Sequence, residues 1–253
     1  MSELTIALIV FSCIFGSALL GLSLRALLPE HHLSSESKDV VKLAMGLIAT
    51  MAALVLGLLT ASAKSSFDVQ NAETVHSAAD IIRLDRALAR YGPETKEIRD
   101  LLKKAVAFRI HLTWPEDGST PANLGSPEVT RATEGLEDKI RELSPRNELQ
   151  REFKSQALQI SGELLATRWL RIEQLSNPIP LLFLVVLVFW LSILFGTFGL
   201  FAPRNTTVIV ALVLCVVAVS GSTFLILEMH RPFDGLMKIS PAPMHYALSK
   251  LGQ

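Results

Sequence analysis

The chain has 253 residues, half of them hydrophobic, and its 24 basic and 24 acidic residues give a formal net charge of zero. With a mean hydropathy of +0.40, this composition excludes a disordered chain, and the lack of a basic excess argues against a nucleic-acid-binding protein. The two cysteines, Cys13 and Cys215, lie in long apolar runs, which excludes a disulfide scaffold. Of the 48 charged residues, 35 lie between Lys64 and Pro178. The flanking segments are therefore strongly apolar.

Four apolar stretches in these flanks are long enough to cross a bilayer, which takes about 20 residues of helix. None contains a lysine or arginine, and the first acidic residue is Glu228, near the end of the fourth. The first stretch follows an N-terminus without positive charge, so we expect it to remain as a span and not to be a signal peptide. The predicted spans are Leu4–Leu24, Leu43–Ala63, Ile179–Phe201 and Thr207–Met229.

The spans come in two pairs with short connections, and short connections favour antiparallel helical hairpins. The sequence therefore predicts an all-α membrane protein. Its parts are a first transmembrane hairpin (1–63), a helical cytosolic domain (64–178), a second transmembrane hairpin (179–230), and a C-terminal turn with an amphipathic tail (231–253). The balance of lysine and arginine near the spans favours an orientation with both termini and the insert in the cytoplasm. The expected location is the inner (plasma) membrane.

The insert has helical periodicity throughout. An apolar face runs from Phe67 to Tyr91 and continues the second span, so one long helix is expected to leave the membrane and to stop at Gly92. Further helices are predicted to begin at Pro93, Pro127 and Pro145, with an irregular loop over Trp114–Pro127 and re-entry into the membrane at Pro178. A tail helix beginning at Ser240–Pro241 can lie on the membrane surface or dock against the insert.

The second span carries a stripe of small residues spaced four apart: Ala49, Ala53, Gly57 and Ala61. Small residues allow membrane helices to approach closely. One interpretation is a pore-lining helix or an oligomer axis, with hydroxyls from Thr50 and Thr60. The alternative is packing against the first span, where Ser12 and Gly16 repeat the spacing.

Charged residues mark the edges of the spans: Arg25, Lys64, Asp68, Glu228 and Arg231. The functional interpretation is a charged vestibule, and the alternative is snorkelling with pairing at helix ends. The adjacent His31 and His32 have no partner at metal-ligand spacing, so no metal site is predicted.

No catalytic motif is present. The sequence has no glycine-rich phosphate loop, no HExxH and no nucleophile elbow, and the acidic residues of the insert alternate with basic ones at helical spacing, as in Asp100 with Lys104 and Glu137 with Arg141. Such spacing is typical of solvated helix faces. We therefore expect no catalytic residues, no cofactor and no enzyme activity.

Four segments together resemble a bacterial membrane family of unknown function that is described as bestrophin-like. They are LPEHHLSSESKDVVKLAMGLIATMAALVLGLLTASAKSSFD (Leu28–Asp68), LDRALARYGPE (Leu84–Glu94), FGLFAPRN (Phe198–Asn205) and LILEMHRPFDGLMKIS (Leu225–Ser240). The resemblance implies kinship with bestrophins, pentameric anion channels with four spans and a helical cytosolic part. Bestrophin pores are narrowed by bulky and aromatic residues on the second span. This chain has no aromatic residue between Leu43 and Ser66, so no gate residue is transferred.

These features lead to two functional hypotheses. The first is a channel-like protein, an oligomeric ion channel with the second span near the pore. The alternative is a non-conducting membrane scaffold or sensor whose helical insert binds a partner. The expected partners are the lipid bilayer, further copies of the chain and inorganic ions, and nucleic acid is not among them.

Overall fold

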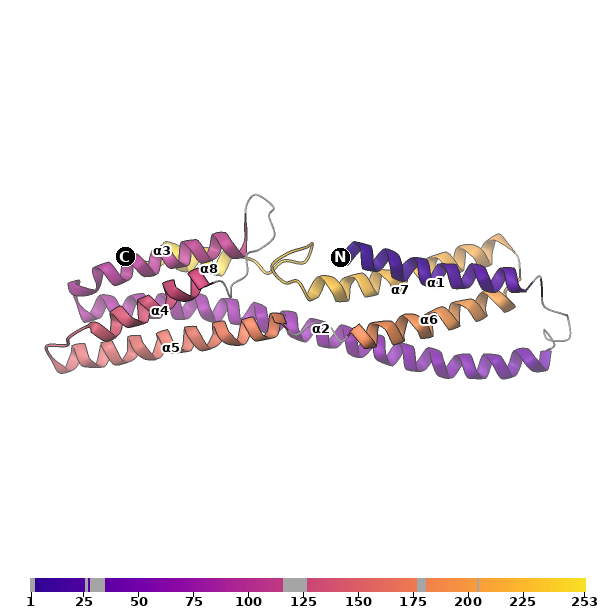
Figure 1. Ribbon diagram of the computed structural model, residues 1–253, viewed down its shortest axis with the longest axis horizontal. Coiled ribbons are helices and arrows are strands. Elements are labelled where there is room, and N and C mark those ends of the chain that lie inside the picture. Colours follow the sequence, from indigo (N-terminus) through magenta and orange to yellow (C-terminus); the bar gives the residue numbers. More distant parts are fainter. Residues whose placement is uncertain (1–2, 26, 28–34, 116–126, 177–180, 204) are drawn as a thin grey trace. The chain divides into compact units, whose positions relative to one another are not determined.

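The computed structural model describes residues 3–25, 27, 35–115, 127–176, 181–203 and 205–253. All regular structure within these ranges is helical (Figure 1). The helices are α1 (Glu3–Leu24), α2 (Ser35–Tyr91), the 3-10 helix η2 (Pro93–Thr95), α3 (Lys96–Thr113), α4 (Pro127–Glu142), α5 (Glu148–Ser176), α6 (Leu181–Phe201), α7 (Thr206–Met229) and α8 (Ala242–Lys250).

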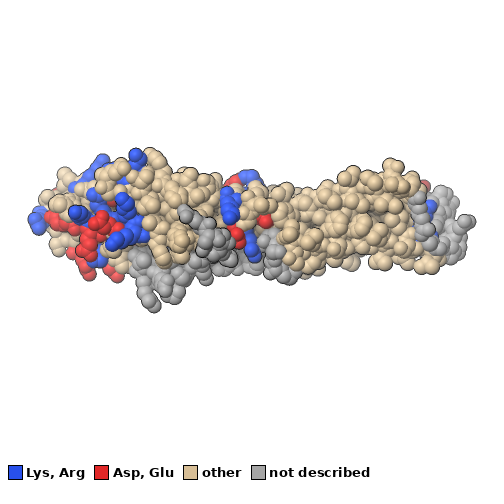
Figure 2. Space-filling model, turned by 90° about the horizontal axis from the view of Figure 1, so that it is seen from above, with Lys and Arg blue, Asp and Glu red and all other residues tan. Residues whose placement is uncertain are grey.

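The chain divides into two compact units, which are described separately. The membrane unit comprises Met1–Ser66 and Pro178–His230, and the polar unit comprises Phe67–Asn177 and Arg231–Gln253. On the face drawn in Figure 2, the charged side chains of the described residues gather on the polar unit, whereas the surface of the membrane helices is almost entirely uncharged. This distribution follows the division of charge along the sequence.

Four helices are long and apolar enough to cross a membrane, and they coincide with the four predicted spans. The third predicted span starts at Ile179, which lies outside the described residues, and its helix is described from Leu181. The second span is the first half of α2, whose 57 residues continue without a break to Tyr91. The expected helix that leaves the membrane is therefore present.

The membrane unit is organised around α1, which packs closely against both α6 and α7. Its core contains Ile14 and Ala18 of α1, Leu187 of α6 and Val216 of α7. Glycines permit the close approach of α1 and α6, because a Cβ on Gly199 would collide with the carbonyl oxygen of Ala18 and lie 3.0 Å from the backbone nitrogen of Leu22. The interface therefore depends on the absence of side chains at this point.

Consecutive spans reverse direction, since α1 ends and α2 begins at one end of the unit, where α6 also ends and α7 begins (Figure 1). Sequence neighbours are nevertheless not the closest partners, because the tightest packing joins α1 to α6 and α7. The second span contributes one buried residue, Ala52, to the core, and one side of the helix packs against this core through partly buried residues: Met45, Ile48, Ala49, Val55, Leu56 and Leu59. The second span is therefore less buried than the other three.

The polar unit is a helical bundle. Its core joins the second half of α2, the inner faces of α3, α4 and α5, and the tail helix α8; representative members are Leu84, Leu102, Ile140, Ile160 and Met244. Met244, Ala247 and Leu251 are almost completely buried, so the C-terminal tail docks on the insert and not on a membrane surface. The structure thus decides between the two placements considered for this tail.

Two helix starts have identifiable causes. Gly92 has a φ of 142°, a conformation that suits glycine, and the Thr95 hydroxyl bonds the carbonyl oxygens of Leu88 and Gly92 at 2.6 and 2.8 Å. α5 begins at Glu148 and not at Pro145 as the sequence suggests, because the Asn147 side chain accepts a hydrogen bond from the backbone nitrogen of Gln150 at 2.8 Å.

Candidate functional site

The stripe of small residues on the second span is largely uncovered within the chain. Ala49 is half-buried, whereas Ala53, Gly57 and Ala61 are exposed. No heavy atom lies within 4 Å of the position that a Cβ on Gly57 would take. Ala49 therefore packs against the core of the membrane unit, whereas Ala53, Gly57 and Ala61 are open in the described part of the chain, and Gly16 of α1 is equally open.

The bare side of α2 is broader than the predicted stripe. Leu47, Met51, Leu54 and Leu58 are 64%, 45%, 64% and 62% exposed, and they recur at alternating spacings of four and three residues. Sequence reasoning overlooked this face because leucine is unremarkable in any membrane span. In the most apolar window of α2 only 6% of residues are buried, against 22–28% in the other three spans. The second span thus has the least internal support.

The two threonines of the second span are exposed and bonded within their own helix. Thr50 and Thr60 donate their hydroxyl protons to the carbonyl oxygens of Leu47 and Leu56, each at 2.8 Å. Back-bonding of this kind satisfies the donor inside an apolar medium and leaves the hydroxyl oxygen able to accept or coordinate. Both side chains are therefore compatible with lipid, with a neighbouring helix and with a passing ion.

The membrane-edge charges are distributed over both units. Arg25, at the end of α1, donates to the backbone oxygen of Ala202 at the end of α6, which ties two spans together. Lys64 is exposed on α2 and Glu228 is buried near the end of α7, both in the membrane unit. Asp68 and Arg231 belong to the polar unit, where Arg231 lies 3.8 Å from Asp234. A shared vestibule remains a prediction.

A buried ion pair in the polar unit was not anticipated. The Arg99 guanidinium donates twice to the Asp85 carboxylate, at 2.8 and 2.9 Å, and Asp85 is only 1% exposed. This hydrogen bonding raises the pKa of Arg99. The signal in the sequence was an aspartate next to the apolar face of a helix, between Leu84 and Leu88.

The same ion pair holds the end of the tail. The backbone nitrogen of Gly252 lies 3.4 Å from the Asp85 carboxylate, and the backbone oxygen of Gln253 accepts from Arg86 at 3.0 Å and from Arg99 at 3.3 Å. Charged groups of α2 and α3 thereby fix the segment that follows α8.

Trp114 anchors the turn that joins the fourth span to the tail. Its indole nitrogen donates to the backbone oxygen of Ile239 at 2.8 Å, and its ring meets Phe233 edge-on with centroids 5.5 Å apart. The turn closes on itself through a 2.7 Å bond from the Ile239 nitrogen to the Pro232 oxygen, and Gly235 has a φ of 87°. The middle of the segment Leu225–Ser240, which carries part of the family resemblance, therefore forms a turn that is held by hydrogen bonds.

The structure does not test the prediction that His31 and His32 form no metal site. His31 and His32 lie outside the described residues, as does most of the Trp114–Pro127 loop. Within the described ranges, no group of three or more His, Cys, Asp or Glu side chains is placed to hold a metal ion.

Four apolar spans and a bundle of polar helices define a helical membrane protein. The family model of the Bestrophin-like domain matches residues 11–244, and the chain belongs to this family. No curated protein matches the chain.

Solved structures share the fold over nearly the whole chain. A variant of a bacterial bestrophin homologue from Klebsiella pneumoniae is 17% identical, with a TM-score of 0.63 over 95% of this chain and 99% of that chain. Another variant of that homologue has a TM-score of 0.62 at 17% identity and the same coverage. A variant of a membrane protein follows at 0.57 and 15% identity, over 94% of this chain and 97% of that chain. At such identities the likeness establishes the fold alone.

Proposed function

We propose that the protein is a homo-oligomeric, channel-like membrane protein that passes inorganic ions, with the second span near the pore. The observation that carries this proposal is the poor burial of α2: 6% of its apolar window is buried, although the other three spans pack around α1. A central helix in an oligomer is covered by other copies and not by its own chain. Membership of the Bestrophin-like family supports the same assignment.

The two exposed surfaces of α2 suit different roles in this proposal. The small residues Ala53, Gly57 and Ala61 permit close approach between helices, whereas Leu47, Leu54 and Leu58 offer bulky apolar contacts at the spacing used by packed helices. Thr50 and Thr60 supply hydroxyl oxygens for a permeating ion. The proposal assigns the chain no catalytic role.

The proposed location is the inner membrane, with both termini and the polar unit in the cytoplasm. Four spans place both ends and the segment between the second and third spans on one side. Labelling of single cysteines with a membrane-impermeant thiol reagent on spheroplasts tests this orientation. Labelling of Ser249→Cys in intact spheroplasts would show that the C-terminal tail lies outside the cytoplasm and would contradict the proposed orientation.

Flux from liposomes tests the pore. Purified protein is reconstituted with opposed chloride and potassium gradients, and a reversal potential set by one ion gives the selectivity. Ala53→Trp should abolish the flux, because a large ring fills a narrow helix contact, whereas Ala218→Trp, an equally exposed alanine on α7, should leave it within about twofold. Equal flux from Ala53→Trp and wild type would exclude the second span as the pore.

A second hypothesis rests on the continuity of α2. This helix runs from the membrane unit into the polar unit as far as Tyr91, so a displacement in the membrane could reach the bundle. The corresponding function is a non-conducting scaffold or sensor whose polar unit binds a partner. Recovery of one partner by cross-linking through the polar unit, together with no flux from folded oligomer, would favour it over the channel.

A further inference from the structure

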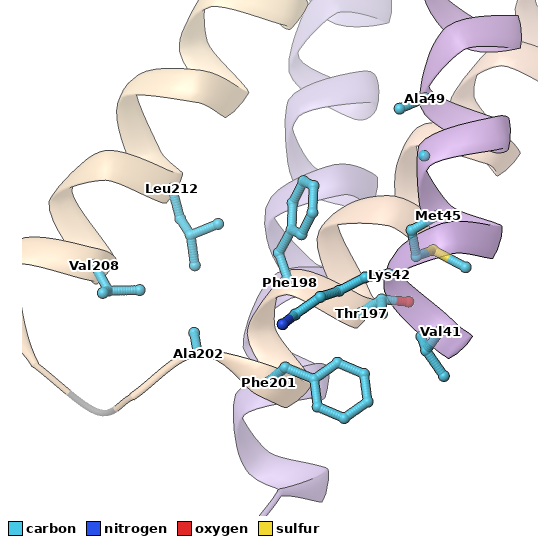
Figure 3. Close-up of a pocket in the computed structure, with 11 residues that line it drawn as sticks. Val41, Lys42, Met45, Ala49, Thr197, Phe198, Phe201, Ala202, Val208 and Leu212 are labelled. Atoms are coloured by element: carbon cyan, nitrogen blue, oxygen red, sulfur yellow. The ribbon is translucent and has the colours of Figure 1, made fainter. Parts of the chain in front are cut away.

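A pocket of about 450 Å³ opens in the membrane unit between α2, α6 and α7 (Figure 3). Cavities of about 300–1,000 Å³ are the usual size of small-molecule sites. Met45 and Ala49 of α2 form one wall, Phe198 and Phe201 of α6 form the back, and Leu212 of α7 faces them. The pocket lies within one chain.

The walls of this pocket are apolar. Thr197 contributes the side-chain hydroxyl of the wall, and it donates to the Ile193 carbonyl oxygen at 2.8 Å and so to its own helix. Water enters a cavity when two or more polar partners hold it, and these walls do not offer them. Such a pocket therefore favours a hydrocarbon chain over water.

The pocket has a charged rim at one end. Among the described residues that line it, Lys42 is the charged one, and in Figure 3 its side chain extends from α2 across the mouth towards Phe198 and Phe201. Lys42 lies 3.2 Å from Asp39, and both side chains are 71% exposed, so this ion pair is weak and open to exchange. A second cation, Arg25, bonds the backbone oxygen of Ala202, another wall residue.

The length of the pocket along α2 is about two-thirds of the thickness of one leaflet. From Lys42 to Ala49 the helix rises about 10 Å at 1.5 Å per residue. Half of a hydrocarbon core of about 30 Å is about 15 Å. The pocket therefore runs from the charged edge of the span towards the middle of the bilayer, with the cation at the headgroup level.

We propose that this pocket binds one acyl chain of an anionic phospholipid, whose headgroup phosphate pairs with the Lys42 ammonium. An open apolar pocket with a cation at its mouth complements a lipid whose acyl chain is joined through glycerol to an anionic headgroup. The lipid fills the space between α2 and the α6–α7 pair, where the chain provides little packing of its own. This inference is independent of whether the protein conducts.

Lipid titration followed by native mass spectrometry tests the proposal. The full-length protein in mild detergent is titrated with phosphatidylglycerol, phosphatidylcholine of the same chains, and oleate. Wild type should hold one phosphatidylglycerol per chain more tightly than the other two. Lys42→Gln should weaken phosphatidylglycerol binding about tenfold and leave phosphatidylcholine unchanged, whereas Lys64→Gln, on the same helix but remote from the pocket, should change neither.

A second pair of variants tests the cavity itself. Gly46 lines the pocket and has no heavy atom within 4 Å of a Cβ position, so Gly46→Phe should fill the pocket and abolish the tight lipid. Gly221→Phe is the matched control, because Gly221 is exposed on α7 and equally open but lines no part of the pocket. Equal lipid binding by wild type and Gly46→Phe would overturn the proposal, and so would binding of oleate as tight as that of phosphatidylglycerol.

Photolabelling tests the proposal on the wild-type protein. Phosphatidylglycerol with a diazirine on its acyl chain should label peptides that contain Met45, Phe198 and Leu212 in preference to the lipid-facing Leu182. Uniform labelling of all exposed positions would show only bulk lipid and overturn the proposal. Cross-linking of Gly46→Cys between two chains would instead assign the pocket to a second copy.

Discussion

Asp85 is a charged residue that is buried in the polar unit. It is 1% exposed, it accepts two bonds from Arg99, and it lies next to the backbone of the tail. Loss of one partner from a buried ion pair leaves the other without compensation. The pair thus joins α2 and α3 to the tail, which is far from both helices in the sequence.

We predict that Asp85→Asn lowers the free energy of opening of this region by about 3 kcal/mol. Hydrogen exchange on peptides from α3 and α8 measures this quantity locally. Asp80→Asn is the control, because Asp80 pairs with Arg83 at 2.8 Å on the surface and should cost less than about 1 kcal/mol. If both variants lowered the free energy of opening equally, the burial of Asp85 would not increase the contribution of its ion pair to stability.

Glu97 and Lys139 join α3 to α4 at the surface, 2.8 Å apart. The hydrogen bond from Lys139 lowers the pKa of Glu97 below its ordinary value of 4.5. Because the folded-state pKa is the lower one, the stabilisation is complete above 4.5 and is lost as the pH falls through the folded-state pKa.

Thermal unfolding of wild type and Glu97→Gln should therefore differ slightly at neutral pH and converge in acid. Added salt should also reduce the difference, since both side chains are exposed. A difference that persists at a pH of about 3 would mean that the carboxylate charge is not its source.

At the scale of helices, the contact between α1 and α6 depends on glycine. A Cβ at position 199 would meet the backbone of Ala18 and Leu22, and backbone cannot move aside as a flexible side chain can. Gly221 on α7 has open space in the corresponding direction.

These two glycines give opposite predictions for the same substitution. Gly199→Ala should lower the thermal stability in detergent, by about 1–3 kcal/mol, because it forces the helices apart. Gly221→Ala should leave the stability unchanged or raise it by up to about 1 kcal/mol, because alanine favours the helix. If Gly199→Ala left the thermal stability unchanged, α1 and α6 could move apart without loss of stability.

Of the four described spans, the second is the one that its own chain covers least. If further copies cover α2, Ala53→Cys should form cross-linked dimers and larger species with a short bifunctional thiol reagent in native membranes. Ala218→Cys on α7 is the control, and both variants need Cys13→Ser and Cys215→Ser, because the native cysteines are exposed. Monomer from Ala53→Cys in folded protein would place this side of α2 in lipid.

The four spans, the long second helix and the polar insert can be predicted from the residues alone, because hydrocarbon imposes length and apolarity on every crossing helix. The end of α2 before Gly92 and the start of α4 at Pro127 can also be predicted, because glycine and proline have distinct backbone preferences. Sequence spacing could not show that Ala18 of α1 meets Gly199 of α6. Small residues occur on several spans, and three-dimensional packing selects among them.

The positions of the tail and of Asp85 are known from the folded chain and could not be predicted from sequence patterns. An amphipathic helix has the same pattern whether its apolar face meets a membrane or a bundle, and the burial of Met244 assigns it to the bundle. An aspartate in a helical sequence is ordinarily solvated, and only the folded chain brings Arg99 and the tail to it. Local sequence fixes the period of each helix, whereas the choice of partner depends on contacts between residues distant in the chain.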